Sequence, residues 1–188
     1  MRRETKFFLA LALAVSLPAV LTAALQASKP DFSGHWSLDI SASQVPNLGD
    51  IESKKLTVKH QEPKIQIVSR TVLTMGSGAN VLSAVTDGVE RESTGNEEEE
   101  KALQEEAEQS GRYTVGGTAG SSKTRVKALW NGERLVIAST MIDDENGVTI
   151  EKEQTWTLSP DGRTLTVEFV RKGGPGGETK GTEVYRKK

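Results

Sequence analysis

Apolar and polar residues alternate along most of the chain after residue 30, and this periodicity limits the possible folds more than any other feature. Successive side chains of a β-strand point to opposite faces, so alternation predicts strands with one buried face and one wet face. The same pattern recurs at 56–59, 64–67, 125–130, 148–158 and 164–169. The first segment places one set of residues on its apolar face: Phe32, Gly34, Trp36, Leu38 and Ile40. Such strands favour an antiparallel sheet that is wetted on one side.

Short turn sequences join these segments. Asn131-Gly132, residues 144–147 and Pro160-Asp161-Gly162 suit tight turns, because Gly and Asn accept a positive φ at little cost. No helical stretch separates the strands, which argues against βαβ units. A meander of one-faced strands buries its shared face in a barrel or a two-sheet sandwich, and a closed barrel also removes exposed edges. We therefore expect an all-β chain, a single antiparallel up-and-down barrel of about 8–9 strands within residues 28–188.

The N-terminal 27 residues have the three-part pattern of a secretory signal peptide. Arg2, Arg3 and Lys6 precede an apolar run from residue 7 to about residue 25. Small residues follow, and Ala24 or Ala27 precedes the expected cleavage site. A single membrane anchor is the alternative, because the run approaches the ~20 residues that a spanning helix needs. We expect residues 1–27 to be removed, with no stable membrane insertion afterwards and a periplasmic or secreted bacterial location.

Residues 92–123 interrupt the strand pattern with an acidic, Gly- and Ser-rich insertion. Its segment 97–108 holds seven glutamates and one lysine. Lys101 can pair with Glu97 and Glu105 at helical spacing, but neighbouring glutamates repel one another. The segment therefore suits a frayed surface helix or a disordered loop. It lacks the Asp/Asn/Gly spacing of a calcium loop, although capture of calcium or of a basic partner stays open.

Gly34 and Trp36 carry a resemblance to known barrels. The segment 31–38 resembles the Gly-x-Trp opening strand of lipocalin-type barrels. In those barrels the Trp closes the floor and a basic residue of the last strand packs across it, a role that the resemblance gives to Arg186. The whole chain resembles small secreted bacterial lipocalin-like (calycin-type) proteins of uncharacterised function. The pieces that match, in order, are 32–36, 59–63, 86–88, 130–132, 156–162 and 184–187. The resemblance implies a calycin-type barrel and no established reaction.

The composition excludes several kinds of chemistry. The chain has no cysteine, so it holds no disulfide, thiolate metal site or cysteine nucleophile. His35 and His60 are the only histidines, and two cannot make a zinc site that needs three or four ligands. Both suit surface positions. A formal net charge of −2 gives no basic field for nucleic acid. We expect no catalytic residue, no metal and no cofactor.

Other candidate sites fit ordinary structure better. Residues 117–124 lack the Gly that a phosphate loop needs before its Lys. Glu151, Glu153 and Glu168 share a face with many threonines and therefore suit a solvated outer surface rather than a glycosidase cleft.

The barrel interior is the remaining candidate site. A barrel of eight strands is filled by side chains or holds one small ligand, so a dry core is the alternative to a pocket. We expect an exported, non-enzymatic protein that binds a small, mostly apolar molecule there. The alternative is an envelope interaction or structural protein whose acidic insertion binds a basic partner or a divalent cation. The residues expected to line the pocket are Trp130, Met141, Trp156, Leu165, Val167 and Phe169.

Overall fold

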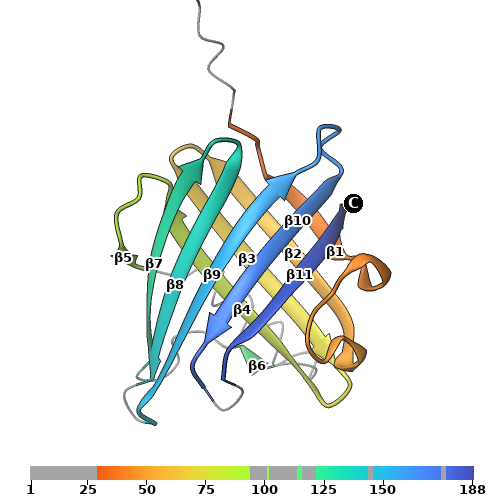
Figure 1. Ribbon diagram of the computed structural model, residues 1–188, viewed down its shortest axis with the longest axis vertical. Coiled ribbons are helices and arrows are strands. Elements are labelled where there is room, and N and C mark those ends of the chain that lie inside the picture. Colours follow the sequence, from red (N-terminus) through yellow and green to blue (C-terminus); the bar gives the residue numbers. More distant parts are fainter. Residues whose placement is uncertain (1–28, 94–100, 102–113, 116–121, 144–145, 175–176) are drawn as a thin grey trace, which may run out of the picture.

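The chain folds into a barrel made almost entirely of β-strands (Figure 1). The computed structural model describes residues 29–93, 101, 114–115, 122–143, 146–174 and 177–188. Its elements are β1 (Gly34–Leu38), η1 (Ile40–Ala42), η2 (Leu48–Asp50), β2 (Ile51–Gln61), β3 (Lys64–Leu73), β4 (Gly76–Val85), β5 (Arg91–Glu92), β6 (Thr114–Val115), β7 (Ser122–Asn131), β8 (Arg134–Asp143), β9 (Val148–Leu158), β10 (Thr164–Lys172) and β11 (Thr179–Lys187).

The strands form one sheet with an up-and-down topology. Their order is β5-β7-β8-β9-β10-β11-β1-β2-β3-β4-β6, and every pairing is antiparallel except that of β6 with β4. Pairing of β11 with β1 brings the last strand beside the first. The predicted all-β up-and-down barrel is confirmed. Ten strands are antiparallel rather than the expected eight to nine, because β5 adds a two-residue strand to the nine longer ones.

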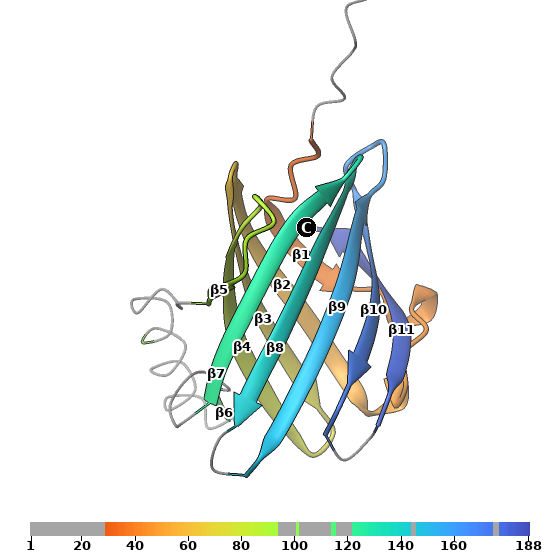
Figure 2. The same cartoon turned by 60° about the vertical axis from the view of Figure 1, so that its left-hand side comes forward.

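The barrel is nearly closed along the seam between β4 and β7, as Figure 2 shows from the side. The chain that follows β4 crosses this seam and hydrogen-bonds to β7. Gly88 N donates to Ala128 O at 2.8 Å, and Ser93 N donates to Thr124 O at 2.7 Å. Ser93 Oγ accepts from Ser83 N of β4 at 3.1 Å, so this segment ties the two sides together.

The faces predicted from alternation agree with the observed burial. Trp36, Trp156 and Leu165, all predicted to face inward, are 1% exposed or less. Ile40 is an exception and is 40% exposed, because β1 ends at Leu38 and the alternation stops before Ile40 begins η1. Glu151, Glu153 and Glu168 lie on the exposed outer face, as expected. The predicted turns also fall between consecutive strands, from β7 to β10.

One end of the barrel is closed by packed aromatic rings, and we call this end the floor. Phe32 is fully buried there; its ring stacks on that of Trp130 with centroids 5.9 Å apart. Trp36 Nε1 donates to Phe32 O at 3.0 Å. Lys187 Nζ lies 5.2 Å from the centroid of the Trp36 ring. The C-terminus lies at the same end (Figure 1).

Lys187 therefore takes the place that the resemblance gave to Arg186. Arg186 is exposed and pairs with Asp39, 3.0 Å from Nε to Oδ2. The reason is the alternation of β11, where Tyr185 and Lys187 share the inner face and Arg186 points outward. Gly34 lies directly under Lys187, because a Cβ atom there would be 2.8 Å from Lys187 Cε.

Two predictions concern residues outside this description. The signal segment 1–27 lies wholly outside it, and so does the acidic segment 97–108 apart from Lys101. Both stay predictions. Among the described residues, none belongs to a helix with the length and apolar character needed to span a membrane.

Candidate functional site

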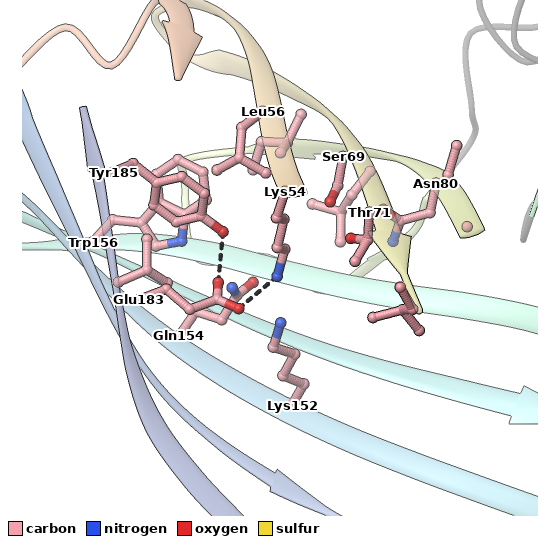
Figure 3. Close-up of a pocket in the computed structure, with 16 residues that line it drawn as sticks. Lys54, Leu56, Ser69, Thr71, Asn80, Lys152, Gln154, Trp156, Glu183 and Tyr185 are labelled. Carbon is pink, nitrogen blue, oxygen red and sulfur yellow. Dashed lines mark hydrogen bonds and ion pairs between the residues drawn. The ribbon is translucent and has the colours of Figure 1, made fainter. Parts of the chain in front are cut away.

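A cavity of about 470 Å³ lies inside the barrel, at the end away from the floor. Strands β2, β3, β4, β9, β10 and β11 contribute inward-facing side chains to it (Figure 3). Its volume is within the range of roughly 300–1,000 Å³ that small-molecule sites occupy. The interior is therefore hollow at one end and packed at the other.

Apolar side chains form the part of the wall nearest the floor. Leu56, Ile67, Leu82, Trp156 and Val167 line the cavity there. All five have the inward parity of their strands. Four of them belong to the main core cluster, and Leu82 packs against it. This wall can desolvate the apolar part of a ligand.

A buried ion pair crosses the cavity from β2 to β11. Lys54 Nζ lies 2.5 Å from Glu183 Oε1, and the Tyr185 hydroxyl donates to Glu183 Oε2 at 2.7 Å (Figure 3). Glu183 is 6% exposed. Burial alone would raise its pKa, but the ammonium groups of Lys54 and Lys152 and the two hydrogen bonds hold the pKa below its usual 4.5. Burial and the Glu183 charge raise the pKa of Tyr185 well above 10. Glu183 is thus charged and doubly hydrogen-bonded.

Lys152 is a second cation in the same cavity. Burial, followed by repulsion from Lys54 and Arg171, lowers its pKa from 10.5 to about 8, although Glu183 acts in the opposite direction. Its Nζ lies 5.2 Å from the ring centroid of Phe169. In the described part of the chain, no carboxylate lies within 4.0 Å of this ammonium group. Lys152 is therefore a poorly compensated charge inside the barrel.

The indole N–H of Trp156 is a second polar group in the wall of the cavity. Trp156 is 1% exposed, and no acceptor within the described ranges bonds to its indole Nε1–H. In Figure 3 this nitrogen lies on the side of the ring toward Glu183 and Lys54. A buried donor left unsatisfied costs about 1–3 kcal/mol. The wall of the cavity thus contains a donor that lacks an acceptor among the described residues.

The residues predicted to line the pocket occupy different depths of the barrel. Trp156 and Val167 line the cavity. Leu165 is fully buried in the core next to the floor. Phe169 is half-buried below the Lys152 ammonium, and Met141 is half-buried on β8 opposite Ile150.

Trp130 lies at the floor, where it packs on Phe32 and donates from Nε1 to Glu62 Oε1 at 2.8 Å. His60 lies beside it, and the prediction of a surface position for His60 is wrong. Its side chain is 3% exposed. The ring is buried because both nitrogens have partners: Phe32 N donates to Nδ1 at 3.3 Å, and Nε2 lies 3.0 Å from Glu62 Oε1. His35 is exposed, as expected.

The sequence predictions missed the polar members of the site, which are Lys54, Lys152, Gln154, Glu183 and Tyr185. A signal for them was present. Each residue has the inward parity of its strand, for example Lys152 and Gln154 with Trp156 on β9.

A larger hollow, of about 740 Å³, lies beside the seam between β4 and β7. Its lining mixes inward side chains such as Ile65 and Val126 with outward ones such as Lys64 and Gln66. Because both faces of the sheet contribute, this hollow does not lie wholly inside the barrel. Among the described residues, no group of three or more His, Cys, Asp or Glu side chains is placed to hold a metal ion.

Comparisons with known proteins add little. No family model matches the chain, and no curated protein matches it. Among solved structures, the chain is similar to the crystal structure of secretory abundant heat soluble protein 4 from Ramazzottius varieornatus. The identity is 11%, the TM-score is 0.42, and the match covers 84% of this chain and 94% of that chain. Similarity at this level carries no argument about function.

Proposed function

We propose that this chain is an exported, lipocalin-like binding protein, and not an enzyme, that holds a small molecule inside its barrel. The observation that carries the proposal is the interior cavity of about 470 Å³ with an apolar wall next to the floor. Aromatic side chains fill the barrel at the floor, so the cavity occupies only the opposite end. The bound molecule has an apolar body, as predicted from the sequence. It also carries polar groups, because polar side chains line part of the cavity.

Binding would work by desolvation in a preformed cavity. The apolar body of the ligand would lie against Leu56, Ile67 and Val167, with a gain of about 25 cal/mol for each Å² removed from water. The barrel hydrogen bonds hold these side chains in place before the ligand arrives, which reduces the entropy lost on binding. A formal net charge of −2 supports a small-molecule partner over nucleic acid.

Fluorescence titration with N-phenyl-1-naphthylamine, a neutral apolar probe, tests the binding proposal. We expect saturable enhancement with the full-length or naturally processed protein. Ser69→Phe would fill the cavity from β3 and abolish the enhancement. Thr166→Phe is the matched control, because Thr166 lies between the inward Leu165 and Val167 on β10. Equal binding by the two variants, or no saturation with the unmodified protein, would overturn the proposal.

Export has its own test. Residues 1–27 carry the signal pattern, so expression of the full chain in a bacterium should yield a periplasmic or secreted product. Its mass should correspond to cleavage after Ala24 or Ala27. An uncleaved product that stays with the membrane fraction would favour the anchor instead.

A further inference from the structure

Two cations and one carboxylate line the cavity. Lys54 comes from β2, Lys152 from β9, and Glu183 from β11 is the carboxylate. Arg171 of β10 adds repulsion on Lys152 from outside the set of lining residues. Glu183 is already engaged by Lys54 and by the hydroxyl of Tyr185. The cluster therefore carries an excess of positive charge.

This excess is unfavourable in the empty barrel. Charges taken out of water need paired charges or hydrogen bonds to offset their lost hydration. Lys54 has such a partner, whereas no carboxylate of the described residues lies within 4.0 Å of Lys152 Nζ. Lys152 is the member of the cluster left for a group from outside.

The unpartnered indole N–H of Trp156 points to the same kind of ligand. Trp156 is 1% exposed and lines the same cavity. The other two tryptophans have acceptors: Trp36 Nε1 donates to Phe32 O, and Trp130 Nε1 donates to Glu62. The indole that lines the cavity is thus the one that lacks an acceptor among the described residues.

We propose that the cavity binds a small amphipathic carboxylate, whose anionic group pairs with Lys152 and whose apolar body lies on the wall formed by Leu56, Ile67 and Val167. The inference rests on the proposed binding function and adds the charge of the ligand to it. Trp156 offers its N–H to an oxygen of the ligand. Glu183 keeps Lys54 in place and disfavours a second carboxylate, so the site suits a monoanion.

Three probes that share a ten-carbon chain length in their alkyl part separate charge from apolar contact. Decanoate and decyltrimethylammonium below their micelle concentrations, and decanol below its solubility limit, compete with bound N-phenyl-1-naphthylamine. We expect decanoate to bind at least about tenfold more tightly than decanol, since a hydrogen bond between charged groups is stronger than one between a charged and a neutral group. Decyltrimethylammonium should be the weakest competitor.

Two variants assign the preference to one side chain. Lys152→Met should abolish the preference for decanoate and leave decanol binding unchanged or tighter. Lys152→Arg keeps the charge and should keep the preference. Lys127→Met, on the exposed face of β7, is the matched control and should behave like the unmodified protein.

The outcomes separate the two proposals. Equal affinity for decanoate and decanol, with saturable probe binding, overturns the carboxylate inference and leaves the binding function intact. Absence of saturable probe binding overturns the binding function, and the inference with it. A preference that survives in Lys152→Met assigns the anion to other groups and overturns the role of Lys152.

Two further readouts would move only if the anion contacts these groups. The groups that face Lys152 are Lys54, Arg171, Glu183 and the hydroxyl of Tyr185 on Glu183. With its pKa near 8, Lys152 loses its charge by pH 9.5, so the preference for decanoate should fall there but persist in Lys152→Arg. Decanoate should also shift the indole N–H resonance of Trp156 more than those of Trp36 and Trp130. An unchanged Trp156 resonance with bound decanoate would exclude its N–H from the site.

Discussion

Replacing Glu62 by Gln should lower the free energy of unfolding of the barrel at neutral pH. Glu62 lies in the turn between β2 and β3 and accepts four side-chain hydrogen bonds. The donors are His60 Nε2 at 3.0 Å, Trp130 Nε1 at 2.8 Å, Thr86 Oγ1 at 2.9 Å and Lys29 Nζ at 3.1 Å. One carboxylate thus joins the β2–β3 turn, the aromatic floor and the chain that follows β4.

The pKa of Glu62 sets the size of the effect. Burial would raise this pKa, but the hydrogen bonds from His60, Lys29, Thr86 and Trp130 lower it from 4.5 to about 2. A change of that size corresponds to about 3.4 kcal/mol for a fully buried group. The Glu62 side chain is 36% exposed, so solvent screening reduces this to about 1–2 kcal/mol.

The sign of the pH dependence follows from the lowered pKa. The contribution of the ionised carboxylate is complete above pH 4.5, and it is lost as the pH falls from 4.5 to about 2. Urea unfolding, followed by tryptophan fluorescence, measures the free energy of unfolding of both proteins across this range. Glu62→Gln should be less stable by about 1–2 kcal/mol at pH 7. The difference should vanish near pH 2.

Glu168→Gln is the matched control, because Glu168 is an exposed carboxylate on the outer face of β10. It should leave the free energy of unfolding within about 0.5 kcal/mol of the unmodified value at every pH. A gap between Glu62→Gln and the unmodified protein that stays constant from pH 7 to pH 2 would refute the reasoning. So would the absence of any gap at pH 7.

Three further changes test the floor and the cavity by urea unfolding. Gly34→Ala should cost about 1–3 kcal/mol, because Gly34 has a φ of 138° and an added Cβ would meet Lys187; an unchanged midpoint would contradict this. Tyr185→Phe should cost about 1–3 kcal/mol by removing one donor from the buried Glu183, and an equally stable variant would show that the hydroxyl is dispensable. Lys152→Met should stabilise the empty barrel at pH 7 by about 1–3 kcal/mol. The pKa of Lys152 is about 8 in the folded state and 10.5 in the unfolded chain, so this gain in stability should shrink as the pH rises from 8 to 10.5. A gain that stays constant over this range would rule out titration of Lys152.

The fold could be predicted from the sequence because the alternation of apolar and polar residues along a strand indicates on which face of the sheet each side chain lies. The outward glutamates of β9 and β10 and the inward Trp36, Trp156 and Leu165 follow from parity alone. The same rule applied to the last strand would have selected Lys187 for the floor, since it shares its parity with Tyr185. A shift of one residue moves a side chain to the opposite face, so Arg186 could not have filled that place.

The site was harder to predict, because parity gives the face but not the depth along the barrel axis. Trp130 and Trp156 both have inward parity, yet one packs at the floor and the other lines the cavity. Depth depends on the stagger between strands, which pairing across the sheet determines. Charged residues of inward parity, such as Lys152 and Glu183, were the available signal for a polar cavity.

The two ends of the barrel treat buried polar groups differently, and this difference predicts that stability and binding can be changed separately. At the floor, the indole of Trp130 and both nitrogens of His60 have partners within the protein, and Glu62 is the common acceptor. In the cavity, among the described residues, no acceptor bonds to the indole of Trp156, and the ammonium group of Lys152 lies over the Phe169 ring without an ion pair. Glu62→Gln should therefore lower stability without changing the preference for decanoate over decanol. Lys152→Met should remove the preference while raising stability. If each variant changed both properties, the floor and the cavity would not be independent parts of the barrel.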